Sequence, residues 1–312
     1  MSKTLIILNP HAGGGRAGQL WTQIEPLLWD KLGELAVAVT QRPEEVAHHL
    51  DKMYATGLNR VISIGGDGTN HALVNALANL SEQYPEGEPV IYGMFPVGTG
   101  QDWARSAGIP LNDIEAAADW VANAQPYPTD IGLMTLDNNL PEKPLEKPRR
   151  EHFLNIASTG LGGEVDKRVN QAAVRRPWTF LAATVATILQ FKPQPIQIQL
   201  DDQDWYEGGA LTLVVANGTT FGHGMKIAPN AQIDDGLFDV VLVKDASKLD
   251  TLMALRRVYD GSHLTHPAVQ FSRAKKVQVQ GKAIQSLDLD GEYASARQIT
   301  FELRPGLLHL LR

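Results

Sequence analysis

The sequence predicts an α/β domain with a mostly parallel sheet, followed by a domain that is mainly an antiparallel β-sandwich. Three observations lead to this fold class. The chain has 312 residues, more than the roughly 250–300 at which a single hydrophobic core stops growing. Short apolar runs alternate with helical patterns in residues 4–125, as in a βαβ series. Later segments alternate apolar and polar residues, which is typical of strands with one solvated face.

The first domain is expected to alternate strands and helices. Its strands are short runs of aliphatic residues, and its helices repeat apolar residues every three or four positions. Strands are predicted at residues 5–8, 35–39, 61–64 and 90–95. Helices are predicted at residues 20–28, 43–53, 73–80 and 114–121, with a further helix through Asp102. This alternation favours a parallel sheet covered on both faces.

The second domain is expected to be built mainly from strands. They are predicted at residues 196–200, 211–216, 238–243, 277–279, 287–289 and 299–303. Helices are predicted at residues 164–171, 178–190 and 248–259. Residues 123–128 form a linker candidate with two prolines, and residues 137–150 a charged loop with three prolines. The predicted domains are therefore 1–126 and 127–303.

Composition limits the function classes. Hydrophobic residues make up 43% of the chain and charged residues 20%, as in ordinary globular proteins. The formal net charge of −7 argues against nucleic acid as a partner, and Cys 0 excludes disulfides and thiolate chemistry. The N-terminus lacks a signal-peptide pattern and no run is long enough to span a bilayer, so a cytoplasmic protein without a transmembrane segment is expected.

A glycine-rich turn, Gly65-Gly66-Asp67-Gly68-Thr69, stands between a predicted strand and a predicted helix. Such a turn presents backbone N–H groups and a helix N-terminus to an anion, which is phosphate-binding geometry. Asp67 cannot bind phosphate and is interpreted as a ligand of a phosphate-bound cation or as an orienting group. By itself, the motif is also compatible with an ordinary tight turn.

Two further glycine-rich turns follow strands of the same predicted sheet, at residues 9–16 and 96–102. Because the carboxyl ends of parallel strands meet at one edge of a sheet, the three turns are expected to converge there. The Walker pattern, which needs Gly-Lys-Ser/Thr after four spacers, is absent. The sequence therefore predicts a polyphosphate site of another kind.

Together with Asn9-Pro10, Pro96-Val97-Gly98-Thr99 and Asp290-Gly291-Glu292, the 65–69 turn resembles the diacylglycerol kinase catalytic family in its bacterial, soluble form. The resemblance covers essentially the whole chain. It implies a lipid kinase with ATP and Mg²⁺ as cofactors, and an active site in the cleft between the two domains. It also implies that the last segment, residues 304–312, returns to the first domain.

The resemblance assigns roles to individual residues. The positions that match ATP contacts are Asn9, Pro10, His11, Ala12, Gly13, Thr40, Gly65, Gly66, Asp67, Gly68, Thr69 and Thr99. Asp290 and Glu292 match the acidic residues that act in base catalysis on the lipid hydroxyl, without a choice between the two. A structural magnesium is implied at the Asp235 carboxylate and at backbone oxygens near Gln232 and Leu237. Gln101 and Asn70-His71-Ala72 depart from the family pattern and are expected to tune nucleotide or substrate contacts.

A lipid substrate implies peripheral contact with a membrane surface. The candidate segment for that contact is residues 175–181, a basic pair followed by aromatic residues, although a core or pocket-lining helix explains it equally well. Diacylglycerol is the expected substrate, and an oligomer is compatible with the sequence. Two alternatives remain: an NAD kinase, which shares the Asp67 turn, and an inactive lipid- or nucleotide-binding regulator.

Overall fold

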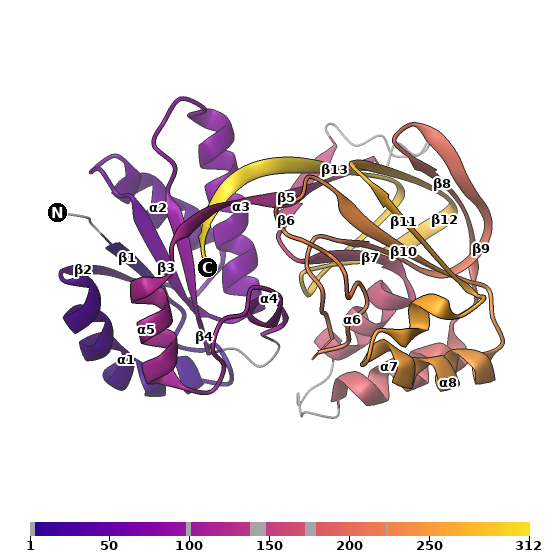
Figure 1. The fold of residues 1–312 in the computed structure, drawn as a ribbon, viewed down its shortest axis with the longest axis horizontal. Helices are drawn as coiled ribbons and strands as arrows, with labels where there is room; N and C mark the ends of the chain where they lie inside the picture. Colours follow the sequence, from indigo (N-terminus) through magenta and orange to yellow (C-terminus); the bar gives the residue numbers. More distant parts are fainter. Residues whose placement is uncertain (1–3, 98–100, 138–147, 172–178, 223) are drawn as a thin grey trace. The chain divides into compact units, whose positions relative to one another are not determined.

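A computed structural model describes the chain apart from residues 1–3, 98–100, 138–147, 172–178 and 223 (Figure 1). The chain divides into two compact units. Unit 1 comprises residues 1–131 and 305–312, and unit 2 comprises residues 132–304. Strands β5 (Pro126–Asp137) and β13 (Glu292–Leu311) each begin in one unit and end in the other.

Unit 1 alternates strands and helices along the chain. Its elements are β1 (Thr4–Leu8), α1 (Arg16–Leu32), β2 (Leu35–Val39), α2 (Glu44–Tyr54), β3 (Arg60–Gly65), α3 (Asp67–Gln83), β4 (Ile91–Pro96), α4 (Asp102–Ser106) and α5 (Ile114–Asn123). The strands pair in parallel in the order β2-β1-β3-β4, and the end of β13 adds a further parallel strand beside β4. This confirms the α/β class predicted for the first half.

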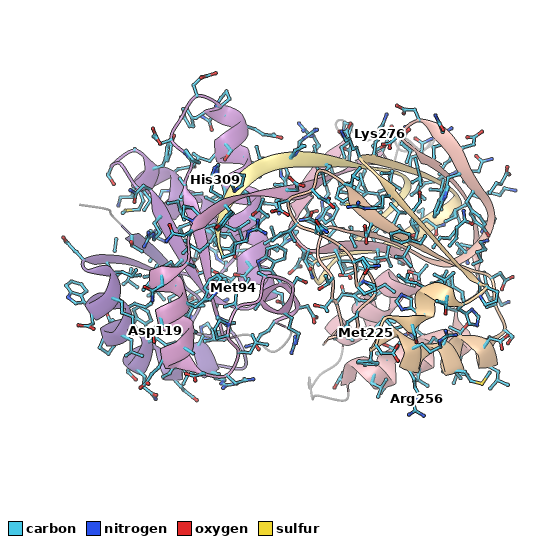
Figure 2. All side chains as sticks on the ribbon, viewed as in Figure 1. Met94, Asp119, Met225, Arg256, Lys276 and His309 are labelled. Atoms are coloured by element: carbon cyan, nitrogen blue, oxygen red, sulfur yellow. The ribbon has the colours of Figure 1, made fainter. Side chains whose placement is uncertain are left out.

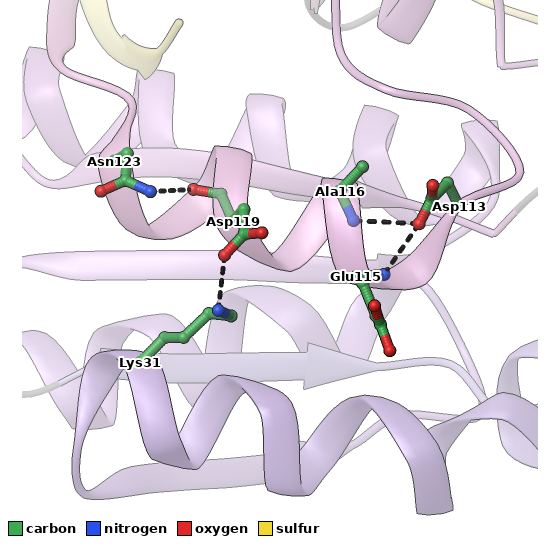
Figure 3. A network of polar contacts seen from close by, with 6 residues as sticks. All are labelled: Lys31, Asp113, Glu115, Ala116, Asp119 and Asn123. Atoms are coloured by element: carbon green, nitrogen blue, oxygen red, sulfur yellow. Dashed lines mark hydrogen bonds and ion pairs between the residues drawn. The ribbon is translucent and has the colours of Figure 1, made fainter.

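Helices cover both faces of this sheet. Ile62 and Ile64 of β3 pack in one buried cluster with residues of α1 and α5, whereas α3 packs on the opposite face, where it meets Ser63. The Asp113 side chain caps α5 by accepting hydrogen bonds from the next turn, and Lys31 of α1 pairs with Asp119 of α5 (Figure 3). The ion pair joins α5 to α1, and residues of both helices share the buried cluster.

Unit 2 is mainly antiparallel. Besides β5 and β13 it contains β6 (Arg149–Phe153), β7 (Ile156–Gly160), α6 (Leu161–Gln171), α7 (Thr179–Gln190), β8 (Gln194–Leu200), β9 (Gln203–Ala216), β10 (Phe238–Lys244), α8 (Lys248–Val258), η1 (Ser262–Thr265), β11 (Val269–Ala274) and β12 (Lys276–Leu289). The strand order is β11-β10-β9-β7-β12-β13, and β8 pairs with both β9 and β12.

Aromatic packing holds the core of unit 2. The ring of Phe153 lies 5.7 Å from that of Phe238 in a stacked pair and 6.0 Å from that of Phe301 in an edge-on pair. Helices α7 and α8 lie side by side outside this core, and the Arg256 side chain extends away from α8 (Figure 2). Among the described residues, no helix is both long and apolar enough to cross a bilayer.

Several elements differ from the sequence prediction. Strands β6, β7 and β11 were not predicted, and β5 begins at Pro126, inside the segment interpreted as a linker. The linker interpretation was therefore wrong for residues 126–128. Pro126 opens the strand at a position where its missing N–H costs no ladder hydrogen bond. Most of the predicted 137–150 loop lies outside the described residues.

Candidate functional site

The turn after β1 is shaped by glycines. Gly13, Gly14 and Gly15 have φ angles of 62°, 70° and 92°, a region that residues with a Cβ adopt at a cost. A Cβ on Gly13 would lie 2.8 Å from the Val97 carbonyl oxygen, so the turns after β1 and β4 approach each other closely. Asn9 shapes the same turn, since its Oδ1 accepts the His11 N–H at 3.0 Å.

The turn after β3 packs against the first one. Asn9 Nδ2 donates to the Thr69 hydroxyl at 3.1 Å, which links the two turns. A Cβ on Gly65 would lie 2.6 Å from Thr69 Cβ, so Gly65 leaves the space that the threonine occupies. Thr40, after β2, donates its N–H to the Leu8 carbonyl at 2.8 Å.

Most predicted nucleotide positions therefore lie at one edge of the sheet. The structure brings together residues 9–13, Thr40 and residues 65–69, at the carboxyl ends of β1, β2 and β3. Thr99 lies outside the described residues. The N-terminus of α3, which begins at Asp67, stands at this edge, where helix N–H groups and the helix dipole favour an anion.

Two departures from the family pattern face the protein interior. Asn70 Oδ1 accepts hydrogen bonds from Ser63 Oγ at 2.5 Å and from the Tyr92 hydroxyl at 3.0 Å, and all three side chains are buried. Gln101 is buried too and donates to the Pro96 carbonyl at 3.1 Å. Both side chains bond to the scaffold beneath the turns, and their expected effect on nucleotide or substrate contacts stays a prediction.

The predicted catalytic turn joins β12 to β13 in unit 2. Asp290 and Gly291 both have positive φ, at 50° and 92°. The Asp290 carboxylate accepts three backbone N–H groups, from Leu154 at 2.6 Å, Asn155 at 3.0 Å and Ile156 at 2.9 Å. Glu292 is solvent-exposed. The two predicted acids thus share one turn but have different surroundings.

Two asparagine side chains connect the segment that Asp290 contacts to the rest of unit 2. Asn155 Nδ2 donates to the Thr220 carbonyl and Asn217 Nδ2 to the Leu154 carbonyl, each at 2.8 Å. Both asparagines are buried. These bonds connect the 154–156 segment to the start of the loop after β9, where the Asn217 and Gly218 N–H groups both donate to the Asn155 carbonyl at 2.9 Å.

Asp288 is an acidic residue near this turn that the sequence interpretation missed. It lies on β12, and its Oδ1 accepts the Gly291 N–H at 2.8 Å. Burial raises its pKa well above the ordinary aspartate value, and Asp166 on α6 and the neighbouring Asp290 and Glu292 add to that rise. The period-two pattern of β12 could have revealed Asp288, because it places this residue on the face opposite Leu287 and Leu289.

Glycines bring α6 close to β12. A Cβ on Gly163 would lie 2.4 Å from the Leu287 backbone nitrogen, and one on Gly162 would overlap the Ser158 hydroxyl. The Ser286 hydroxyl on β12 donates to the Glu164 carboxylate on the same helix. This close contact explains why the charge of Asp166 on α6 affects the pKa of Asp288.

The predicted metal segment lies in the loop before β10. Asp235 Oδ1 accepts the Leu237 N–H at 3.1 Å, and Asp235 Oδ2 pairs with the Arg273 guanidinium. Arg273 Nε also pairs with Asp239 Oδ1 at 3.0 Å. Gln232 is exposed in the same loop.

Asp239 provides the test of whether a cation fits here. Its side chain is 1% exposed, and its Oδ2 has no hydrogen-bond partner in the described structure. Burial raises its pKa, while Arg273 opposes that rise. Within the described ranges no three His, Asp or Glu side chains gather to hold a metal, so a cation would depend on carboxylates and carbonyls. The oxygens fit a cation, and the Arg273 guanidinium already supplies positive charge beside them.

The predicted membrane segment is described only in part. Residues 175–178, which include the basic pair Arg175-Arg176, lie outside the described residues. Helix α7 begins at Thr179, and its Leu181 side chain is 47% exposed.

Family models match both halves of the chain. Residues 3–134 match the diacylglycerol kinase catalytic domain, and residues 155–312 match the YegS C-terminal NAD kinase beta sandwich-like domain. Together these models span nearly the whole sequence.

Similar proteins come from several bacteria. A diacylglycerol kinase of Mycobacterium tuberculosis is 27% identical, with 100% of this chain and 96% of that protein covered. A diacylglycerol kinase of Bacillus subtilis is 26% identical, with 94% and 90% covered. A probable lipid kinase YegS-like of Pseudomonas putida is 28% identical, with 88% and 84% covered.

Solved structures share the fold. A crystal structure of a diacylglycerol kinase from Bacillus anthracis has a TM-score of 0.71 at 22% identity, covering 99% of this chain and 96% of that one. Yeast NADH kinase complexed with NADH has a TM-score of 0.53 at 10% identity, covering 99% and 82%. The family models and relatives agree on one conclusion: this chain is a kinase and belongs to the diacylglycerol kinase family of lipid kinases, with a catalytic domain followed by a YegS-type C-terminal domain.

Proposed function

We propose that this lipid kinase transfers the γ-phosphate of ATP to the hydroxyl of diacylglycerol, giving phosphatidic acid. The observation that carries the proposal is the joining of the turns after β1 and β3 through Asn9 and Thr69. That arrangement aims backbone N–H groups and a helix N-terminus at one edge of the sheet, as an anionic phosphate chain requires. The names of the relatives from Mycobacterium tuberculosis and Bacillus subtilis support diacylglycerol as the acceptor.

We assign ATP binding to the first domain, residues 1–126 with 304–312. In this assignment the turns at residues 9–13 and 65–69, with Thr40 and Thr99, contact the nucleotide. Phosphoryl transfer depends on positioning and charge neutralisation more than on covalent chemistry. Mg²⁺ bound with the nucleotide would neutralise its phosphate oxygens, and Asp67 at the start of α3 is the carboxylate assigned to orient it.

We assign the lipid acceptor to the second domain, residues 127–303. The acceptor hydroxyl must lose a proton as it attacks the γ-phosphorus, and a carboxylate within hydrogen-bond reach accepts that proton. Asp290 and Glu292 are the carboxylates assigned to this step. A lipid acceptor also requires peripheral contact with a bilayer, for which the exposed Leu181 on α7 is suited.

A structural Mg²⁺ in the second domain is a further part of the proposal. Asp235 and the backbone oxygens of Gln232 and Leu237 would hold it, with a contribution from the unpartnered Asp239 oxygen in the described structure. Such oxygen ligands suit a hard cation. Arg273 already pairs with Asp235 and Asp239. The guanidinium and the cation would therefore compete for the same two carboxylates.

The test is transfer of labelled γ-phosphate from ATP to a panel of acceptors in mixed micelles, with and without Mg²⁺. The panel contains dioleoylglycerol, sphingosine, phosphatidylglycerol, undecaprenol and NAD. We expect Mg²⁺-dependent labelling of dioleoylglycerol above all others. Preferential labelling of another lipid would keep the lipid kinase and overturn the diacylglycerol assignment.

NAD kinase is the second candidate, because yeast NADH kinase shares the fold and the C-terminal family model is named for NAD kinase. The same panel separates the two. Labelling of NAD alone would establish this alternative, and absence of transfer to every acceptor would favour an inactive regulator.

A further inference from the structure

Strand β2 forms one edge of the unit 1 sheet. It pairs in parallel with β1 and with no other strand that the structure describes. Its five residues, Leu-Ala-Val-Ala-Val, include no charge and no proline, and its pairing with β1 runs without a bulge. Soluble proteins usually protect an edge with such features, because unpaired backbone groups there recruit another strand. The edge of β2 therefore lacks the usual protection.

Other edge strands of the molecule carry charged residues. Among the described strands, β6 pairs with β5 alone and begins with Arg149, Arg150 and Glu151. Strand β11 pairs with β10 at the other end of the strand order and contains Arg273. Charges of this kind oppose pairing with a further strand. The uncharged edge of β2 is thus a specific feature of this strand and not of the sheet edges in general.

The outward backbone groups of β2 belong to alternate residues. Thr40, directly after the strand, donates its N–H to the Leu8 carbonyl at 2.8 Å, so its backbone points toward β1. Backbone groups of successive strand residues point to opposite sides. Counting back from Thr40, the even-numbered residues of β2 bond to β1, and the odd-numbered ones turn their N–H and C=O groups away from it. These outward groups belong to Leu35, Val37 and Val39.

Exposed apolar side chains accompany these backbone groups. Val37 is 40% exposed and Val39 54%, and Trp29 on α1 is also 54% exposed. Lys31 pairs with Asp119 of α5 on one side of α1, and Trp29, two residues earlier, lies about 200° away around the helix axis. Because α5 packs on β4 and the strand order is β2-β1-β3-β4, the Trp29 side of α1 is the side toward β2.

The strand is complementary to a second copy of itself. In an antiparallel pair about a twofold axis at Val37, this residue lies opposite its own copy, and Leu35 lies opposite Val39 of the second copy. The outward groups of all three residues then exchange hydrogen bonds. The next pair is Glu34 with Thr40, so no like charges meet. A strand of another protein would have to supply this uncharged pattern, whereas every copy of this chain carries it.

We propose that two copies of this chain associate through antiparallel pairing of their β2 strands about a twofold axis at Val37. The pairing joins the two unit 1 sheets into one continuous sheet, and Trp29 adds apolar area beside it. Because the contact is small, the dimer is expected to be weak, with a Kd on the order of micromolar. This inference does not depend on the reaction proposed above.

Cysteine cross-linking tests the axis directly, because the chain has no cysteine of its own. Val37→Cys places two thiols on residues whose Cα atoms lie about 5.5 Å apart in the dimer, within the range of a disulfide. Val39→Cys is the matched control. It lies on the same face and is more exposed, but its two copies are four residues apart along the strands, about 14 Å.

Mild oxidation should give a disulfide-linked dimer of Val37→Cys and at least about tenfold less of it for Val39→Cys. Equal cross-linking of the two variants would overturn the pairing, since it would reflect random collision. Cross-linking of Val39→Cys alone would overturn the axis at Val37.

Sedimentation equilibrium measures association without a cross-link. Wild type should be a mixture of monomer and dimer, and Val37→Lys should weaken association about tenfold or more by placing a charge at the centre of the edge. Phe271→Lys is the control, because Phe271 lies on the edge strand β11 and is also 40% exposed. A wild-type protein that stays monomeric at about 1 mM would overturn the proposal, as would equal association of Val37→Lys and wild type.

Amide hydrogen exchange locates the interface and needs no variant that has to fold. As protein concentration rises, exchange should slow at Leu35, Val37 and Val39 and stay constant at residues 36 and 38, which already bond to β1. A dimer that forms without this alternation would overturn the β2 interface. Protection of these amides only when a cell extract is added would overturn the second copy as the partner and indicate a strand of another protein.

Discussion

The Asn9 side chain donates a hydrogen bond to the Thr69 hydroxyl at 3.1 Å and so ties the turn after β1 to the first helical turn of α3. Both residues belong to the proposed nucleotide site. The bond joins segments 60 residues apart in the chain. Its loss should let the two turns move apart.

We expect Asn9→Ala to raise the KM for ATP by about two- to tenfold, the range that one neutral hydrogen bond contributes. Thr69→Val should have a similar effect, and the double variant should add little, because both substitutions remove the same bond. Steady-state kinetics at varied ATP concentration checks this. Thr22→Val, which removes an exposed hydroxyl on α1, is the control, and fully additive effects would contradict the coupling.

The adjacent Gly65 and Gly66 allow a matched comparison of two alanine substitutions. A Cβ on Gly65 would lie 2.6 Å from Thr69 Cβ, whereas a Cβ on Gly66 would meet only Ala12 Cβ, at 3.9 Å. Gly65→Ala should therefore lower the free energy of unfolding by about 1–3 kcal/mol, as overpacking does, and Gly66→Ala should leave it nearly unchanged. Urea unfolding of both variants measures the difference. Equal destabilisation would show that Thr69 moves aside without cost.

Asp288 should make stability depend on pH. Because its folded-state pKa is raised, it stabilises the fold fully at pH values below the ordinary aspartate range. That contribution is lost as pH rises through the raised folded-state pKa, so wild-type stability should decline over this interval. Asp288→Asn should flatten the decline. Thermal melts of both proteins across pH 4–8 test this, and parallel curves would contradict it.

Arg273 should set the response to Mg²⁺. Arg273→Ala leaves the buried Asp239 carboxylate without its partner and should lower stability by about 1–3 kcal/mol. Mg²⁺ should raise the Tm of this variant more than that of wild type, because the cation then neutralises Asp235 and Asp239 without competition. Arg42→Ala, which breaks an exposed pair with Glu45, serves as the control. An identical Mg²⁺ shift in wild type and Arg273→Ala would contradict the competition.

Periodicity made unit 1 predictable. Runs such as residues 61–64 belong to buried parallel strands, and their helices repeat apolar residues at helical spacing, so local pattern and tertiary packing agree. Unit 2 was harder. Strand β7, Ile-Ala-Ser-Thr-Gly, is buried along its whole length and shows no alternation, and β11 has few large apolar residues. Their positions depend on pairing with distant strands, which a local pattern does not contain.

The candidate site also has a part that local sequence patterns predicted and a part that depends on distant contacts. Glycine spacing marked the turns after β1 and β3 because close backbone approach leaves a local signature. The sequence could not show that Asn70 points to Ser63 and Tyr92, or that Arg273 lies opposite Asp239 in the β10–β11 pairing. Those contacts depend on strand register. Asp290 and Glu292 look equivalent in the motif, but only Asp290 bonds to the distant 154–156 segment.

The last residues of the chain complete the sheet of the first unit. His309 and Leu310 pair with Ile91 and Tyr92 of β4, Leu311 lies in the α1–α5 core, and Arg312 exchanges backbone hydrogen bonds with Gln125. During synthesis on the ribosome, the N-terminal unit therefore emerges with one strand missing and the edge of β4 exposed. It reaches its final form only after residues 305–312 have been made. Premature stop codons near residue 305 should consequently damage the unit that was made first.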